Sequence, residues 1–200
     1  MQHWKRGDTV RGGNVSIDED YKRHLRKAHD GSIWGATGNK YSGEWVRGLL
    51  RDRPYLQSVL DFGAGKGTLG AGIQGVAEWV DYDPGIPGKD VLPNRQFDMV
   101  VSTDCLEHVE PTHIEATIVQ IGSRAKKVVA LDIPCYATGN VFSEGPYEGQ
   151  DYHLIVKPPD WWKAITKKYL PEFQMFSCTT EERMSKGKYR RRVRLVYERL

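Results

Sequence analysis

The sequence predicts one α/β domain built on a largely parallel sheet. Helical apolar spacing opens the chain, short apolar runs ending in polar or glycine-rich turns follow, and a helical pattern separates two of those runs. An apolar fraction of 39% over 200 residues is enough for one hydrophobic core. Because no apolar run approaches the roughly 18 residues that span a bilayer, and the opening residues lack a secretory apolar stretch, we expect a cytoplasmic protein.

Charge and cysteine content narrow the function classes only slightly. Lys and Arg number 29 against 26 Asp and Glu, and the resulting net charge of +3 does not require a nucleic-acid partner. Three widely separated cysteines support neither a disulfide framework nor a CxxC metal clamp.

The chain divides into an arm, a domain and two accessory segments. Residues 1–15 mix glycine with polar residues without any period, so we expect a flexible arm there and a single domain over 16–200. Within the domain, residues 16–55 are predicted to form N-terminal cap helices. Residues 135–152 are glycine-rich and aperiodic, and they are long enough to act as a lid loop.

Two helices are predicted before the first strand. Ser16 and Glu19 can form a capping box at the start of the first. Apolar residues recur at helical spacing over 17–28 and again over 41–50, and Pro54 ends the second pattern.

Six segments are predicted to be strands, and two further helices accompany them. The strands are expected at 59–61, 77–80, 97–101, 127–131, about 173–178 and 189–197. Helices are expected between the third and fourth strands, marked by Ile114, Ile118 and Ile121, and after Pro158.

The last strand carries a basic pattern. Val193, Leu195 and Tyr197 alternate with Arg192, Arg194 and Val196, which predicts one buried and one largely basic face. Residues 181–188 are expected to connect this strand to the previous one, and the basic run over 186–194 is typical of the solvated face of an edge strand.

The most informative motif follows the first predicted strand. Over 59–68 the chain reads Val-Leu-Asp-Phe-Gly-Ala-Gly-Lys-Gly-Thr, a turn whose glycines let a ligand lie on backbone N–H groups. A P-loop is excluded, because Lys66 is followed by Gly67 rather than by Ser or Thr. The GxGxxG pattern over 65–70 is weak support for a dinucleotide, because it begins four residues past Asp61 instead of directly after the strand.

An acid after the second strand favours a ligand with an adenosine end and no phosphate. Asp83 lies about twenty residues after Gly63, where a carboxylate can hold the two ribose hydroxyls. Asp61 and the glycines would then contact an amino-acid end of the ligand. Asp81 could take the ribose role with a register shift of two, and Asp90 is either a solvated loop residue or an adenine-side contact.

With these features the sequence resembles the class I S-adenosylmethionine-dependent methyltransferases over about 21–200. Residues 60–67 resemble the family's first motif, Asp83 its ribose-binding acid, and 97–109 its segment after the fourth strand. The residues around Trp34, and later 153–162, are similar to small stand-alone methyltransferases of phages and bacteria.

The resemblance implies a Rossmann-like, seven-stranded, mostly parallel sheet with an antiparallel last strand and helices on both faces. It also implies that S-adenosylmethionine lies across the carboxyl ends of the first strands. The cofactor-binding residues expected on this basis are Trp34, Asp61, Gly63, Ala64, Gly65, Gly67, Asp83, Pro84, Ser102, Thr103 and Asp104. Trp34 is equally plausible as an ordinary core residue.

Two histidines are candidates for a general base. His108 follows the fourth strand of the family plan, at the rim where cofactor and acceptor should meet, and an ordinary histidine pKa is about 6.5. It could equally satisfy backbone groups at a helix start. His153 follows the glycine-rich loop and is a second candidate. No metal site is expected, since His24 and His29 are five residues apart and share no helix face.

The expected reaction is methyl transfer to a hydroxyl or amine of a small molecule or glycan. DNA-base methylation is disfavoured, because no Asn-Pro-Pro-Tyr or Asp-Pro-Pro-Tyr follows the family's fourth strand, and Asp132-Ile133-Pro134-Cys135-Tyr136 comes after the fifth. Two alternatives stay open. One is an RNA or DNA methyltransferase that uses the basic C-terminal strand, and the other is a module that binds the cofactor without transferring its methyl group.

Overall fold

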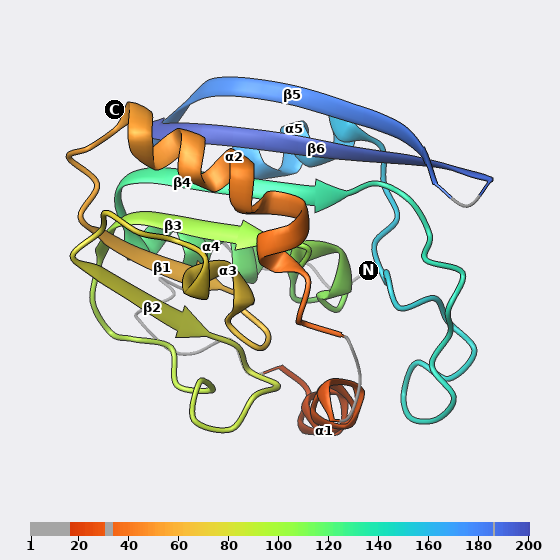
Figure 1. The fold of residues 1–200 in the computed structure, drawn as a ribbon. Helices are drawn as coiled ribbons and strands as arrows, with labels where there is room; N and C mark the ends of the chain where they lie inside the picture. Colours follow the sequence, from red (N-terminus) through yellow and green to blue (C-terminus); the bar gives the residue numbers. More distant parts are fainter. Residues whose placement is uncertain (1–16, 31–33, 186) are drawn as a thin grey trace, which may run out of the picture.

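A sheet of six strands forms the centre of the molecule in the computed structural model, which describes residues 17–30, 34–185 and 187–200 (Figure 1). The strand order is β2-β1-β3-β4-β6-β5. The strands are β1 (Ser58–Phe62), β2 (Glu78–Tyr82), β3 (Phe97–Thr103), β4 (Ala125–Pro134), β5 (Phe173–Ser185) and β6 (Lys188–Arg199). Strands β1 to β4 are parallel, and β6 runs antiparallel to both β4 and β5.

Helices cover both faces of this sheet, as Figure 1 shows. They are α1 (Glu19–His29), α2 (Gly38–Asp52), α3 (Thr68–Ala71), α4 (Ile114–Arg124) and α5 (Pro159–Tyr169), with a single 3₁₀ turn η1 (Leu106–His108). On one face, Val46 of α2 belongs to a buried apolar cluster with Val59 and Met99 of the sheet. On the other, Ile118 and Trp162 belong to a second cluster. Helix α1 lies apart from both faces, beyond the carboxyl ends of the parallel strands.

The predicted α/β class is confirmed, but the seventh strand implied by the family resemblance is not found in the described residues. Residues 83–96, between β2 and β3, form turns and loops. This segment contains Pro84, Pro87 and Pro93, which cannot donate to a strand ladder. Parallel strands need a crossover of a dozen or more residues, so the segment is also too short to hold an additional strand with its own crossover helix.

The start of α1 differs from the predicted capping box. Ser16 and the predicted arm over 1–15 lie outside the described residues. The N-cap is Asp18, whose carboxylate accepts hydrogen bonds from the backbone N–H of Asp20 (2.8 Å) and Tyr21 (3.2 Å). A charged oxygen at this position satisfies two of the unpaired N–H groups of the first turn.

Strands β5 and β6 form a longer hairpin than the sequence predicted. They pair as far as Ser185 and Lys188, so the segment 181–188, predicted as a connection, is largely strand. Opposite charges across the two strands support this extension: Arg194 pairs with Glu181, and Arg191 with Glu182.

The prediction that the basic strand lies at a sheet edge is wrong. Strand β6 lies between β4 and β5, and β5 is the edge strand on this side of the described sheet. The side chains of β6 are buried on both faces, with Leu195 and Tyr197 on one and Arg192 and Val196 on the other.

Glycines in the β1–α3 loop allow unusually close backbone packing. A Cβ added to Gly63 would overlap the Sγ of Cys105, and one added to Gly65 would lie 2.6 Å from the Cα of Gly35. Both glycines have positive φ, 84° and 53°, a region that L side chains rarely adopt. The loop is therefore pressed between the end of β3 and the segment that leads into α2.

The N–H groups of this loop are already hydrogen-bonded within the protein. Those of Gly63 and Ala64 donate to the carbonyl of Tyr82, that of Gly65 to Asp83, that of Lys66 to the carbonyl of Gly35, and that of Gly67 to the carbonyl of Ala64. The expectation that a ligand lies on these N–H groups is therefore wrong for this structure, because neighbouring carbonyls and a carboxylate satisfy them.

Replacement of Gly63 by alanine tests this packing against a control with the same backbone angle. Gly63 and Gly75 both have φ of 84°, but a Cβ at Gly75 meets nothing within 4 Å. Gly75→Ala should cost only the left-handed backbone strain, about 1–2 kcal/mol. Gly63→Ala should cost about 1–3 kcal/mol more because of overpacking. Urea unfolding followed by circular dichroism measures both, and equal losses would contradict the close packing against Cys105.

Candidate functional site

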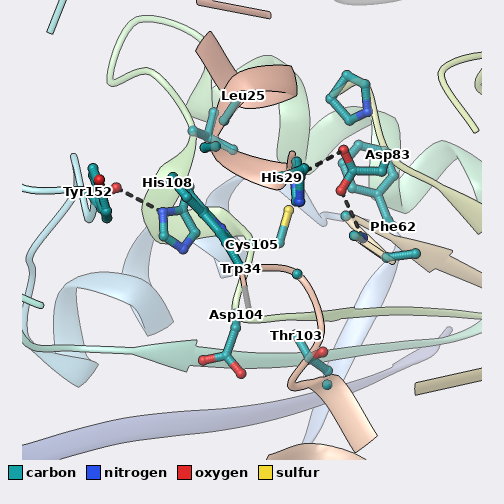
Figure 2. A pocket seen from close by; sticks show the side chains of 18 of the residues that line it. Leu25, His29, Trp34, Phe62, Asp83, Thr103, Asp104, Cys105, His108 and Tyr152 are labelled. Atoms are coloured by element: carbon teal, nitrogen blue, oxygen red, sulfur yellow. Dashed lines mark hydrogen bonds and ion pairs between the residues drawn. The ribbon is translucent and has the colours of Figure 1, made fainter. Parts of the chain in front are cut away.

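A cavity of about 650 Å³ lies at the carboxyl ends of β1, β2 and β3. Its floor comes from the ends of these strands and the loop 63–65, and its cover from α1 and the segment around Trp34. Residues of the loop after β4, including His153, close one side. Figure 2 shows Tyr152 on that side. This volume is in the range of small-molecule and cofactor sites.

Nine of the eleven predicted cofactor-binding residues line this cavity. They are Trp34, Asp61, Gly63, Ala64, Gly65, Asp83, Pro84, Thr103 and Asp104. Gly67 does not line it: it is the N-cap of α3, and a Cβ there would overlap the carboxylate of Asp81. Ser102 is also absent from the lining and is buried in β3. The binding roles themselves stay predictions.

Asp61 places an unsatisfied carboxyl group at the end of β1. It is 1% exposed, and neither of its oxygens has a hydrogen-bond partner among the described residues. Burial, and then the nearby carboxylates of Asp81 and Asp83, raise the pKa of Asp61 well above its usual range, although Lys89 lowers it. A cationic group in the cavity would supply the missing partner for its ionised form.

Asp83 lies directly after β2 and faces the cavity (Figure 2). Its two carboxylate oxygens accept hydrogen bonds from the N–H groups of Gly65 and Gly85, each at 2.8 Å. The Nε2 of His29 lies 3.9 Å from one of them. Since each oxygen can accept a further hydrogen bond, Asp83 retains capacity for a ligand diol.

The two alternative acids lie away from the cavity lining. Asp81 accepts from the indole of Trp79 (2.9 Å) and the ammonium of Lys89 (2.8 Å). Asp90 pairs with Arg26 at 3.2 Å and contacts Lys22 at 3.9 Å. Their positions favour Asp83 as the ribose acid and a structural role for Asp90.

Acidic groups dominate the cavity next to the glycine loop. Asp61, Asp83 and Asp104 all line it there, whereas Lys66 of the loop does not. Phosphate groups are normally held by basic side chains or free N–H groups. A cationic ligand therefore suits this part of the cavity better than a dinucleotide pyrophosphate does.

The two predicted general bases meet at one side of the cavity. The Nδ1–H of His108 donates to the carbonyl of Tyr152 at 2.8 Å, and that of His153 to the carbonyl of Tyr136 at 2.6 Å. The Nε2 atoms of both rings lie 3.7 Å from the same oxygen of Glu107.

Burial makes both imidazoles weak bases. It is the largest cause that lowers the pKa of His108 to about 3, and it also lowers the pKa of His153. The ordinary pKa expected for His108 is therefore wrong. With so low a pKa, His108 accepts a proton poorly near neutral pH. A base role for either ring stays a prediction.

Tyr21 and Tyr152, which the sequence did not indicate as site residues, complete the cavity. The ring of Tyr152 stacks on Trp34 with centroids 4.7 Å apart, and Trp34 lies 5.2 Å from the ring of His108. The hydroxyl of Tyr21 donates to the carbonyl of His108 at 2.5 Å. Spacing along the chain gives no signal for the stacking partner, because Trp34 and Tyr152 are joined only by the fold.

The predicted lid contacts α1 rather than standing free. Tyr147 donates to Glu110 at 2.8 Å and packs edge-on against Tyr21, with ring centroids 5.1 Å apart. Glu144 pairs with Lys27 at 2.7 Å. These contacts place 135–152 and α1 on the same side of the cavity, and a lid function stays a prediction.

Two arginines of the basic strand are used inside the protein. Arg192 pairs with Asp104 at 2.6 Å and with Asp132 at 2.9 Å, and Arg194 pairs with Asp132 at 3.1 Å. Because these two guanidinium groups already pair with carboxylates, they are less available to bind the phosphate groups of a nucleic acid.

Comparisons with known proteins place this fold. No protein-family model and no curated protein matches the sequence. Among solved structures, magnesium protoporphyrin IX methyltransferase from Synechocystis PCC 6803 with bound S-adenosylmethionine is similar, with a TM-score of 0.58 and 16% identity over 94% of this chain and 100% of that one.

Two further solved structures of methyltransferases have a similar fold. The 1,6-didemethyltoxoflavin-N1-methyltransferase of Burkholderia thailandensis, with its substrate and S-adenosylhomocysteine, has a TM-score of 0.61 at 16% identity over 94% of this chain and 92% of that one. The N-methyltransferase NodS of Bradyrhizobium japonicum WM9, with S-adenosylhomocysteine, has a TM-score of 0.56 at 10% identity over 90% and 98%. None of the helices described in the structure is long and apolar enough to cross a membrane. The chain has the fold of the class I S-adenosylmethionine-dependent methyltransferases.

Proposed function

We propose that the protein is an S-adenosylmethionine-dependent methyltransferase. One observation carries the proposal: in this fold, the cavity at the carboxyl ends of β1 and β2 presents the unpartnered carboxyl group of Asp61 beside the carboxylate of Asp83. Parallel α/β sheets bind ligands at this edge. The cavity presents two acids and no phosphate-binding loop. It therefore matches a ligand that has a cationic group at one end and a nucleoside at the other.

The residues present fit the cofactor in chemical terms. Asp61 can accept hydrogen bonds from an ammonium group, which relieves the cost of its burial. Asp83 can accept from the two hydroxyls of a ribose with its free lone pairs. Trp34 and Tyr152 provide an aromatic wall near the rim. When bound, the cofactor supplies an electrophilic methyl group on a positively charged sulfur.

The protein's main contribution to such a reaction is alignment. An acceptor held in line with the methyl group reacts without first losing translational and rotational freedom, an effect worth up to ~7–11 kcal/mol. The cover formed by α1 and the loop after β4 can hold both partners and exclude water.

The proposed acceptor is a hydroxyl or amine of a small molecule or glycan. The solved structures of similar fold include enzymes named for porphyrin and toxoflavin substrates. Arg192 and Arg194 are paired with acids, which favours this class over a nucleic acid bound along β6. The acceptor would enter between α1, His108 and the 135–152 lid.

Replacement of Asp83 by asparagine tests the ribose contact. Loss of the charged acceptor should weaken S-adenosylhomocysteine binding at least about tenfold, or ~1.4 kcal/mol, measured by calorimetry. Asp81→Asn is the matched control two residues away, and it should bind nearly as tightly as the unmodified protein because Asp81 faces Lys89. Equal weakening by both substitutions would count against the assignment of Asp83.

The raised pKa of Asp61 predicts a pH dependence of cofactor binding. Only the ionised carboxylate pairs with the ligand's ammonium group, so the complex holds fewer protons than the free protein, and affinity should keep rising as the pH increases above the range in which an ordinary carboxyl group titrates. Asp61→Asn cannot ionise and should bind more weakly with a flat profile over the same increase in pH. An unchanged slope in the variant would assign the pH dependence to another group.

Transfer itself is tested with methyl-labelled cofactor and fractionated cell extract. The proposal predicts label in the small-molecule or glycan fraction, and less label with Asp83→Asn at the same subsaturating cofactor concentration. Label in RNA or DNA would instead support the nucleic-acid alternative. Label that stays on the donor in every fraction, despite tight binding, would identify a module that binds without transferring.

A further inference from the structure

Three potential metal ligands converge at the side of the cavity formed by η1 and the loop after β4. They are a carboxylate oxygen of Glu107 and the Nε2 atoms of His108 and His153, and all three lie within 4.8 Å of one another. Glu107 is 0% exposed, and neither of its oxygens has a hydrogen-bond partner among the described residues. A buried carboxyl group without any partner is costly, so its position requires an explanation.

The hydrogen bonds of the two rings show which nitrogen atoms are free. A backbone carbonyl can only accept, so the Nδ1 atoms that contact Tyr152 and Tyr136 carry the protons. In the neutral rings each Nε2 then presents a lone pair toward Glu107. The separation of 3.7 Å is too long for a hydrogen bond, even from a protonated carboxyl group.

No cationic side chain in the described residues is hydrogen-bonded to Glu107. The guanidinium of Arg192 is committed to Asp104 and Asp132, through two different nitrogens. Three electron-pair donors therefore lie close together, an arrangement that a positively charged ion stabilises.

We propose that Glu107, His108 and His153 bind a divalent transition-metal ion of the zinc, manganese or iron class. Two imidazoles and one carboxylate are a recurrent donor set for these ions. A metal-binding histidine usually donates its other ring N–H to a carbonyl or carboxylate, which fixes the orientation and tautomer of the ring. His108 and His153 each donate to a backbone carbonyl in this way. Ligand bonds of about 2.0–2.2 Å require the three atoms to lie closer together than they do in this structure.

The site opens toward the cavity. His108 and His153 line it, whereas Glu107 lies behind them. Three protein ligands leave coordination positions free on the cavity side, where the acceptor is proposed to enter. This part of the inference rests on the proposed function, and it favours a hydroxyl acceptor over an amine.

A metal ion in this position would act as a Lewis acid toward that hydroxyl. It lowers the pKa of the bound hydroxyl, so that the proton passes to solvent and the oxygen becomes nucleophilic. The new oxygen–carbon bond then forms as the sulfur–carbon bond breaks, and the sulfonium becomes a neutral thioether. The two histidines would thereby contribute as ligands rather than as proton acceptors.

Metal binding is tested on the full chain after treatment with a chelator and without cofactor. Calorimetry with Zn²⁺ and Mn²⁺ should show one site, whereas Mg²⁺, which prefers oxygen ligands, should bind more weakly. Glu107→Gln should reduce Zn²⁺ affinity at least about tenfold. The control is His113→Ala, because His113 lies 3.4 Å from Glu110 in a separate pair and should leave binding unchanged.

A spectroscopic measurement keeps the test independent of folding in the variants. X-ray absorption of the zinc-loaded unmodified protein should show two imidazole ligands and one carboxylate. Absence of zinc binding, equal binding by Glu107→Gln, or a ligand set without imidazole would overturn the inference. If S-adenosylhomocysteine still binds in that case, the proposed function stands; if zinc binds and the cofactor does not, the proposed function fails alone.

Discussion

The buried guanidinium of Arg192 is the interaction on which the carboxyl edge of the sheet depends. It lies between Asp104 after β3 and Asp132 of β4, and it belongs to β6, so it ties three strands together. Asp132 also accepts from the hydroxyl of Ser42 at 2.9 Å, which extends the network to α2. Removing one partner of a buried pair leaves an uncompensated charge and costs about 3–5 kcal/mol, more than most single contacts contribute. The network thereby holds Asp104, two residues before the turn η1, at the carboxyl edge of the sheet.

Much of the fold could be predicted from local patterns, because those patterns are caused by burial. All six strands and α1, α2, α4 and α5 were recognisable from apolar spacing, and only their ends moved. The seventh strand came from the family resemblance and not from the residues, and the prolines of 83–96 speak against it. The length of the β5–β6 hairpin could not be predicted, since its outer part is held by charge pairs between strands rather than by an alternating apolar face.

The candidate site was predictable where its residues share one motif and unpredictable where the fold alone unites them. Asp61, the glycine loop and Asp83 could be found because each follows a strand of a parallel sheet, and such ends meet at one edge. The role of the glycines could not be predicted from the motif. Their N–H groups form hydrogen bonds within the protein, and the absence of side chains allows close packing against Cys105 and Gly35. Glu107 and His108 are neighbours in sequence, but no sequence pattern predicts that His153 lies beside them in the fold.

The strand order has a consequence for how the chain is made. In the described sheet β5 pairs only with β6, and β6 separates it from β4, so β5 has no place in the sheet until the following strand has been synthesised. During that interval the outer edge of β4 is open to association with other chains. Until then Asp132 also lacks its ion pairs with Arg192 and Arg194, because both arginines belong to β6. Synthesis of β6 thus gives the chain both the antiparallel part of its sheet and the counter-ions of Asp132.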